Sequence, residues 1–357
     1  MRIALIAPLV TPIREPQLRG SQAFLSDLAA GLTTRGHAVH VYAAAGSAIP
    51  GVTVVDTGVD AESLTASRYR ADGTAAIASG PMEAAFRCVY AGVRRGDYDV
   101  VHNHAFDAPA VRLARDLAMP IIHTLHLPPD ASVRAALAEV VGGVSPPTVA
   151  AVSRSQARAW GITTILPDGV PVASIPWSDR PGDGVVFAGR FSPEKGGAEA
   201  IEIAGRAGVR IDLYGDPYDR NYAASRIDPS RDRPGVTIHA GVPRAELWRV
   251  MSRAAVALCP AKWDEPFGMV AAEAQAAGTP VVAFRRGGLA EVIVDGTTGY
   301  LTPPDDLDAA AEAVMRIGAI RREACRRHAE ANLNLEASLD AHERLYETVR
   351  RTAAAHA

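Results

Sequence analysis

Short apolar runs alternate along the chain with segments whose apolar residues recur at helical spacing. Ile3–Ala7, Val185–Ala188 and Val281–Phe284 are uninterrupted runs, which predict strands buried on both faces of a parallel sheet. The segment from Ser21, a good N-cap, to Gly36, a helix stop, carries leucines at helical spacing and predicts a helix. Because strands and helices alternate, the pattern predicts an α/β fold.

This alternation runs through the chain twice, with a stretch rich in proline and glycine between the two passes. A length of 357 residues suits two domains, each large enough to bury a core. We predict a first domain over residues 1–170, a hinge over 171–184, a second domain over 185–335 and a final helix within 336–357. Within these domains we expect a long loop at 58–82, suited to cover a bound ligand, an insertion-like loop at 216–232 and helical residues 305–331.

The composition is that of a soluble globular protein, with 48% hydrophobic and 22% charged residues. A net charge of −3 without a lysine- or arginine-rich run argues against a nucleic-acid partner. Cys88, Cys259 and Cys325 form no CxxC pair, which fits a reducing cytoplasm and neither a disulfide framework nor a zinc site. No apolar run approaches the roughly 18 residues of a spanning helix. We predict a cytoplasmic protein, and peripheral contact with a membrane stays open.

The stretch Pro260–Met269 carries the strongest chemical pattern in the chain. It follows a predicted buried strand, Ala255–Cys259, and leads into an alanine-rich helix that Gly278 ends. Glu265 lies in the predicted loop, and Glu273 is expected about two turns along the helix. Ligands of open α/β sheets bind beyond the carboxyl ends of the strands, so both carboxylates are placed to hold hydroxyls of a sugar and a ribose. A carboxylate near a helix start can instead complement the helix dipole, which explains only one of the two.

A second loop with candidate chemistry begins at Gly189, directly after a predicted strand. It carries Arg190 and Lys195 ahead of a helix that is expected to begin near Gly197. Two cations beside free N–H groups at a helix N-terminus form a cradle for a pyrophosphate. Loop cations on their own are more often solvated surface, but the presence of Glu265 in the same half of the chain favours the binding role.

Four histidines lie near the ends of two predicted strands: His102, His104, His123 and His126. They lack the spacing of a helical metal motif and have no carboxylate companion, so a metal site is the less favoured interpretation. His102 lies within its strand and is predicted to be a packed histidine. Gly20 precedes a helix, where backbone N–H groups can meet an anion, but the absence of GxGxxG argues against a nicotinamide dinucleotide enzyme.

Together these motifs resemble glycosyltransferase family 4. The family signature of two glutamates separated by seven residues is present at Glu265 and Glu273, with Pro-Phe-Gly after the first and Gly-Thr-Pro-Val-Val closing the helix. Its Gly-Arg, four residues, Lys-Gly motif begins at Gly189, and its Asp-Val-Val-His-x-His pattern ends at His104. Its Pro-Asn-Gly-Val motif is present with Asp168 in place of the asparagine.

The resemblance implies a GT-B fold, in which two Rossmann-like doubly wound domains face each other across an interdomain cleft and the final helix crosses back to the first domain. It implies transfer of a sugar from a nucleoside diphosphate sugar to a small-molecule or glycan acceptor, with retention at the anomeric carbon. It also implies no essential metal and no cofactor besides the donor substrate.

The same resemblance implies the roles of the site residues. Arg190 and Lys195 stabilise the departing diphosphate, Glu265 orients the sugar, Glu273 holds the ribose and His104 positions the sugar. The expected catalytic residues are His104, Arg190, Lys195 and Glu265, and the expected donor-binding residues are Gly20, Gly189, Arg190, Lys195, Glu265, Phe267, Gly268, Met269 and Glu273.

Two alternatives use the same residues. A sugar-nucleotide epimerase or a phosphorylase of this fold would also bind a diphosphate or phosphate at these loops. A non-catalytic sugar-nucleotide sensor would bind the donor without turnover, although a sensor could lose some of these intact charged residues. The nucleotide base, the sugar, the acceptor, the linkage and the oligomeric state are not fixed by the sequence.

Overall fold

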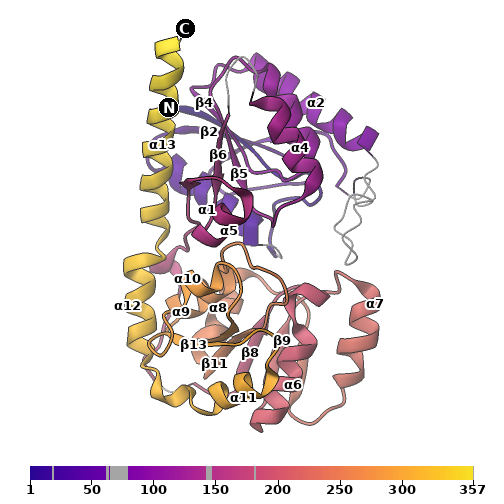
Figure 1. Ribbon diagram of the computed structural model, residues 1–357, viewed down its shortest axis with the longest axis vertical. Helices are drawn as coiled ribbons and strands as arrows, with labels where there is room; N and C mark the ends of the chain where they lie inside the picture. The colour runs from indigo at the N-terminus through magenta and orange to yellow at the C-terminus, as the bar shows by residue number, and fades with distance from the viewer. Residues whose placement is uncertain (18–19, 62–63, 65–78, 142–146, 181, 357) are drawn as a thin grey trace. The chain divides into compact units, whose positions relative to one another are not determined.

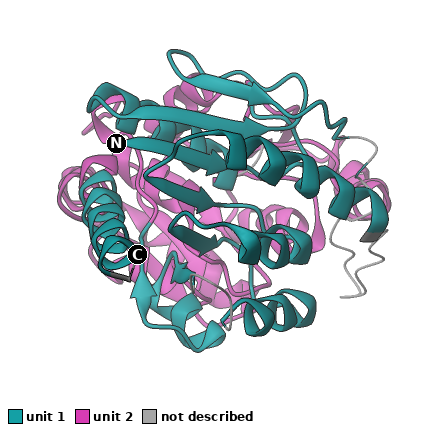
Figure 2. Cartoon of the chain, turned by 90° about the horizontal axis from the view of Figure 1, so that it is seen from above, with its two compact units in different colours: residues 1–14, 21–167, 338–357 teal, residues 15–20, 168–337 magenta. Residues whose placement is uncertain are grey.

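The chain forms two compact units, each built on one parallel sheet (Figures 1 and 2). In the computed structural model the described residues are 1–17, 20–61, 64, 79–141, 147–180 and 182–356. Unit 1 comprises residues 1–14, 21–167 and 338–357, and unit 2 comprises residues 15–20 and 168–337. The expected ligand-covering loop at 58–82 falls mostly outside the described residues.

Unit 1 contains a seven-stranded sheet of order β3-β2-β1-β4-β5-β6-β7, and every strand pair is parallel. Its strands are β1 (Arg2–Ile6), β2 (Ala38–Ala43), β3 (Thr53–Asp56), β4 (Val100–Asn103), β5 (Ile121–Leu125), β6 (Thr148–Ala151) and β7 (Thr164–Ile165). Its helices are α1 (Gly20–Thr34), α2 (Ser79–Arg95), α3 (Ala108–Arg112), α4 (Ala131–Val140), α5 (Arg154–Trp160) and nearly all of α13 (Leu335–His356). The order of strands reverses between β1 and β4, which is where such sheets bind ligands.

Unit 2 contains a six-stranded parallel sheet of order β10-β9-β8-β11-β12-β13. Its strands are β8 (Val185–Ala188), β9 (Ile211–Tyr214), β10 (Val236–His239), β11 (Val256–Cys259), β12 (Val281–Phe284) and β13 (Gly299–Thr302). Its helices are α6 (Gly197–Ala207), α7 (Arg220–Tyr222), α8 (Arg244–Arg253), α9 (Met269–Ala276), α10 (Leu289–Val292), α11 (Leu307–Met315) and α12 (Arg322–Asn332). Here the order reverses between β8 and β11. Both sheets confirm the predicted doubly wound α/β class.

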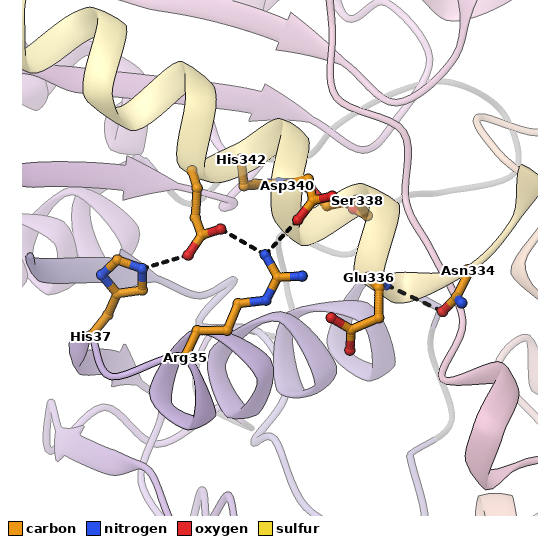
Figure 3. Close-up of polar contacts among 8 residues, drawn as sticks. Arg35, His37, Asn334, Glu336, Ser338, Asp340 and His342 are labelled. Carbon is orange, nitrogen blue, oxygen red and sulfur yellow. Dashed lines mark hydrogen bonds and ion pairs between the residues drawn. The ribbon is translucent and has the colours of Figure 1, made fainter.

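The C-terminal helix α13 is fixed in unit 1 by charged groups at the end of α1 (Figure 3). The Arg35 guanidinium contacts Asp340 at 2.7 Å and Glu343 at 2.6 Å, and Glu343 also lies 2.7 Å from the His37 ring. Gly31 permits close helix contact, because a Cβ at this position would lie 2.6 Å from a methyl carbon of Leu339. Residues more than 300 positions apart in the chain are thereby packed together.

Two arginines of α12 bind the first residues of unit 2 that follow residue 168. Arg322 is buried and donates to the carbonyl oxygens of Ser178 and Ala254 at 2.8 and 2.7 Å. Arg326 donates to the carbonyl oxygens of Ile175 and Ala276 at 3.0 and 2.8 Å. Both guanidinium groups donate to backbone carbonyls of this segment and of unit 2 outside it, so the segment is held at Ile175 and at Ser178.

Some local predictions are wrong. Helix α1 begins at Gly20, so Ser21 lies inside it and is not its N-cap. The expected loop at 216–232 is largely helical, because the Asp219 side chain caps α7 by accepting from the Tyr222 N–H, and the helical turns that follow bury Ala223 and Ile227.

The expected helical stretch over 305–331 is broken in two. Helix α11 ends at Met315, a short turn covers Ile317–Ala319, and α12 starts at Arg322. Gly318 favours the break because glycine is a poor helix former. The buried contacts of Arg322 then fix where α12 begins.

Candidate active site

Two loops meet at the reversal point of the second sheet, where β8 and β11 pair (Figure 1). The loop after β8 carries Arg190 and Lys195, and the loop after β11 carries Glu265. Their backbones touch at Gly196, which has a φ of 74° and where a Cβ would lie 2.0 Å from the carbonyl oxygen of Pro260. Only glycine fits this contact, so the two motifs are held together by their backbones.

Lys195 and Glu265 form a bidentate ion pair. The Lys195 ammonium donates to both oxygens of the Glu265 carboxylate, each at 2.8 Å. The Trp263 indole N–H donates to Glu265 Oε2 at 2.6 Å, and the Lys195 Nζ lies 4.9 Å from the centre of the same indole. The Lys195 and Glu265 side chains are 25% and 16% exposed, so both keep access to a ligand.

Arg190 is held by a carboxylate within its own motif. Its Nε and one terminal nitrogen both lie against Glu194 Oε1, at 2.8 and 2.7 Å, and the Ser192 hydroxyl donates to the same oxygen at 2.6 Å. Burial alone would raise the pKa of Glu194, but the Arg190 charge and the Ser192 hydrogen bond hold this pKa below its usual value. The guanidinium carbon lies 4.5 Å from the centre of the Tyr218 ring. We call Arg190, Glu194, Lys195 and Glu265 the charged cluster.

The backbone around Glu265 is shaped by glycines. Gly268 has a φ of 111° and immediately precedes α9. Gly287 has a φ of 54°, and a Cβ there would lie 2.4 Å from the Glu265 carbonyl oxygen. The Gly288 N–H donates to that oxygen at 2.6 Å. Phe267 and Met269 are buried, and Gly20 contacts the Met269 side chain, since a Cβ at Gly20 would lie 3.2 Å from Met269 Cγ.

Glu273 lies in a separate, buried ion pair. Helix α9 begins at Met269, so Glu273 lies just over one turn into the helix, and not two turns as expected, because Pro266–Gly268 extend the loop. Arg244 donates to Glu273 Oε1 from Nε at 3.1 Å and from a terminal nitrogen at 2.9 Å. The two side chains are 8% and 6% exposed. Both bonds go to Oε1, so Oε2 receives no hydrogen bond from the described residues.

His104 follows β4 at the reversal point of the first sheet, and its backbone N–H donates to the Ile6 carbonyl at 2.9 Å. It is 1% exposed, and its Nδ1 lies 2.9 Å from His126 Nε2. Burial, and then the neighbouring histidines, lower the pKa of His104 well below its usual value, so the ring is neutral. Within the described part of the chain its Nε2 has no partner.

His102 is fully buried. Its two ring nitrogens lie 2.7 Å from the Tyr346 hydroxyl and 2.7 Å from the Thr124 hydroxyl. Among the described residues, no group of three or more His, Cys, Asp and Glu side chains is arranged to hold a metal ion. No helix in the described part of the chain has the length and apolar character needed to span a membrane.

The structure thus brings Arg190, Lys195 and Glu265 together in unit 2, and places Gly20 against Met269. Gly189 lies at the start of the same loop, and its N–H donates to the Tyr214 carbonyl at 3.0 Å. The backbone N–H groups at the start of α6 were expected to be free to bind an anion. One of them already has a partner, because the Ala198 N–H donates to the Tyr222 hydroxyl at 3.0 Å.

Sequence reasoning missed four side chains that contact the predicted site residues: Glu194, Tyr218, Arg244 and Trp263. Glu194 lies inside the Gly-Arg, four residues, Lys-Gly motif, where an acid beside two cations is a detectable signal. Arg244 follows Gly241-Val242-Pro243 at a helix start, a position with no charge pattern of its own. Tyr218 contacts Arg190 and Trp263 contacts Lys195 only because the fold brings these residues together, so their spacing in the sequence gives no signal.

The fold and the site define a GT-B glycosyltransferase. Residues 181–332 match the model for glycosyl transferases group 1, and residues 18–160 match the model for glycosyltransferase family 4. The chain is 31% identical to phosphatidyl-myo-inositol mannosyltransferase of Mycobacterium tuberculosis, over 88% of this chain and 86% of that protein. It is 30% identical to D-inositol 3-phosphate glycosyltransferase of Mycobacterium marinum, over 88% of this chain and 77% of that protein.

The fold is similar to that of HepE from Anabaena, solved in complex with UDP-glucose, with a TM-score of 0.73 and 18% identity over 97% of this chain and 100% of that one. This likeness shows the fold, and the relatives in sequence show the family. The chain belongs to glycosyltransferase family 4 and is an enzyme that transfers glycosyl groups.

Proposed function

We propose that this glycosyltransferase uses a nucleoside diphosphate sugar as donor and transfers the sugar, with retention of anomeric configuration, to a hydroxyl of a small polyol or glycan acceptor. The observation that carries the proposal is the charged cluster, in which Lys195 of one motif donates to both oxygens of Glu265 of the other, while Arg190 faces the same Trp263 ring as Lys195. A diphosphate needs cations, and a sugar needs a carboxylate close to them.

In this proposal Arg190 and Lys195 bind the diphosphate. In the transfer step the bond between the anomeric carbon and the diphosphate oxygen breaks, and a bond to the acceptor oxygen forms on the same face of the sugar. The acceptor hydroxyl gives its proton to the departing diphosphate. Charge develops on that leaving oxygen, and preorganised cations stabilise it, which is the work that a metal ion does in other enzymes.

Glu265 and Glu273 take different parts of the donor. Glu265 accepts from sugar hydroxyls beside the cations, while Oε2 of Glu273 accepts from the ribose. Because Arg244 already binds Oε1, the Glu273 carboxylate is oriented before the donor arrives. His104 interacts with the transferred sugar through Nε2, which has no partner among the described residues, and His126 fixes the His104 ring by a hydrogen bond to its other nitrogen.

An inositol-containing polyol is the acceptor class that we propose to test first. Both relatives compared above carry inositol in their names, and both align with at least three quarters of their own length. The complex of HepE with UDP-glucose supports a nucleotide sugar as the donor.

The decisive experiment pairs donors with acceptors. Thermal shifts with UDP-, GDP-, ADP- and dTDP-sugars identify the donor, since a ligand stabilises the folded state by RT ln(1 + [L]/Kd). Transfer to myo-inositol phosphates is then followed by release of the nucleoside diphosphate, and the anomeric proton coupling of the product reports retention. A product with inverted anomeric configuration would overturn the proposed retention. Isomerisation of the donor without an acceptor would indicate an epimerase, and tight binding without turnover on a broad acceptor panel would indicate a sensor.

A further inference from the structure

One side chain contacts three members of the charged cluster. The Trp263 indole N–H donates to Glu265, its ring lies 4.9 Å from the Lys195 ammonium, and the same ring lies 5.9 Å from the Arg190 guanidinium carbon. Trp263 precedes Glu265 by two residues and is only partly buried, so it does not belong to the hydrophobic core. Its contacts are with the groups that carry the proposed chemistry.

These contacts restrict the conformations of the long cationic side chains in the site. Lysine and arginine side chains have many rotamers, and fixing one of them costs conformational entropy. An aromatic face attracts a cation and excludes water on one side, which favours the rotamer that lies over the ring. Tyr218 contributes a second aromatic face to Arg190, at 4.5 Å from the guanidinium carbon.

We propose that Trp263 is a positioning residue of the donor site with two separable roles. Its ring face holds Lys195 and Arg190 where the diphosphate binds, and its N–H holds the Glu265 carboxylate where the sugar binds. The proposal rests on the proposed function of the charged cluster. It explains why tryptophan occupies this place, because phenylalanine offers the face without the donor and aliphatic residues offer neither.

The two roles predict different losses in two variants. Trp263→Phe keeps the ring and removes the N–H, so binding of the bare nucleoside diphosphate stays within about twofold while turnover of its sugar falls about tenfold or more. Trp263→Leu removes both, so binding of the nucleoside diphosphate weakens by about fivefold or more as well. Trp177→Phe is the matched control, because Trp177 lies in unit 2 and is 44% exposed.

The experiment uses the full chain and whichever of UDP, GDP, ADP or dTDP the wild-type protein binds most tightly. Calorimetry measures binding of the nucleoside diphosphate. Turnover is measured with the matching nucleoside diphosphate glucose or mannose as donor and myo-inositol phosphate or water as acceptor, by the rate at which the nucleoside diphosphate is released. Melting temperatures of all variants separate positioning from loss of fold. The intrinsic fluorescence change on binding is a further signal, which Trp263→Phe removes and Trp177→Phe keeps.

The outcomes distinguish a failure of the proposed function from a failure of the proposed role of Trp263. A wild-type protein that neither binds nor turns over any of these nucleotides would overturn the proposed function and this inference with it. A wild-type protein that does both, while Trp263→Phe keeps full turnover, would overturn the inference alone. Equal loss of diphosphate binding in the Phe and Leu variants would also overturn it, since the two roles would then not be separable.

Discussion

Arg190 and Glu194 form a contact in which two nitrogens of the guanidinium converge on a single carboxylate oxygen. Both side chains are 17% exposed, so the pair is shielded but open to a ligand. The contact orients the guanidinium, and its remaining terminal nitrogen, for which the described residues provide no hydrogen-bond acceptor, can bind another anion. It also places a negative charge beside the proposed diphosphate site, and this charge matters for the mutational test of Arg190.

Arg190→Ala is expected to lower turnover by about 10²-fold or more, the usual cost of removing one preorganised charge stabiliser. Part of that loss comes from Glu194, which would repel the diphosphate once its partner is gone. The double variant Arg190→Ala with Glu194→Gln therefore recovers some donor affinity. Steady-state kinetics and calorimetry on both variants measure the two parts. Wild-type activity is expected to survive excess EDTA, and a loss that Mg²⁺ or Mn²⁺ restores would contradict the role of the cations.

Glu265 and Glu273 are expected to separate in a binding experiment. Glu273→Gln weakens binding of the bare nucleoside diphosphate by about 1 kcal/mol or more, because a charged acceptor for the ribose becomes neutral. Glu265→Gln leaves that binding unchanged or tighter, since it frees Lys195, yet it lowers turnover of the intact nucleotide sugar.

Calorimetry beside kinetics decides between these outcomes, and similar weakening of diphosphate binding by both variants would refute the division of roles. Glu273→Ala is unsuitable for this test. It removes the carboxylate that faces the buried Arg244 charge, and breaking a buried ion pair in this way costs about 3–5 kcal/mol of stability.

The sequence predicted the sheets because buried parallel strands are continuous apolar runs, as Val185–Ala188 and Val281–Phe284 are. Its motifs, through their resemblance to glycosyltransferase family 4, predicted that Arg190 and Glu265 would share a site, and the structure places both residues after strands that pair with each other. It could not show the partners of these residues. The contacts of Glu273 with Arg244 and of Lys195 with Trp263 depend on tertiary packing and not on spacing.

Five buried histidines in unit 1 are expected to make the protein sensitive to acid. Burial lowers the pKa of His123 and His126 to about 3 and that of His342 to about 4, and His102 and His104 are lowered as well. The unfolded chain takes up these protons below about pH 6.5 and the folded chain does not, so stability falls as the pH drops from about 6.5 toward 4.

Denaturant unfolding at pH 7.5, 6.0 and 5.0 measures how the free energy of unfolding changes with pH. Each histidine contributes at most about 1.4 kcal/mol per pH unit to this slope. Asp107, with a pKa raised by burial to about 7, and Asp168 act in the opposite direction and offset part of it. His342→Gln is expected to reduce the slope. A stability that does not change over this range would show that the histidines are solvated or paired with acids.

Asp168→Asn is expected to stabilise the protein at neutral pH. Asp168 is 6% exposed, its Oδ1 has no partner among the described residues, and burial raises its pKa well above the usual value. The folded state therefore holds a proton that the unfolded state releases above about pH 4, so stability is lost as the pH rises. An asparagine carries no such proton, and the resembling motif has asparagine at this place. A melting temperature at pH 7.5 below that of the wild type would contradict this account.

Gly287→Ala is expected to lower turnover by displacing the backbone of Glu265. A Cβ at Gly287 would lie 2.4 Å from the carbonyl oxygen and 2.6 Å from the nitrogen of Glu265, so that backbone must move. A displacement of about 1 Å at a catalytic group can cost about 10²-fold in rate. The φ of 54° adds strain of its own, on the order of 1 kcal/mol.

The control for Gly287→Ala is Gly296→Ala. Gly296 has a φ of 74°, and a Cβ there would meet nothing within 4 Å, so this variant carries the backbone strain without the collision. We expect Gly296→Ala to lose stability in proportion to its strain and to keep wild-type turnover, while Gly287→Ala loses turnover at temperatures where it is fully folded. Steady-state kinetics and thermal melts on both variants separate strain from displacement. Equal turnover in the two variants would mean that the position of the Glu265 backbone does not limit the reaction.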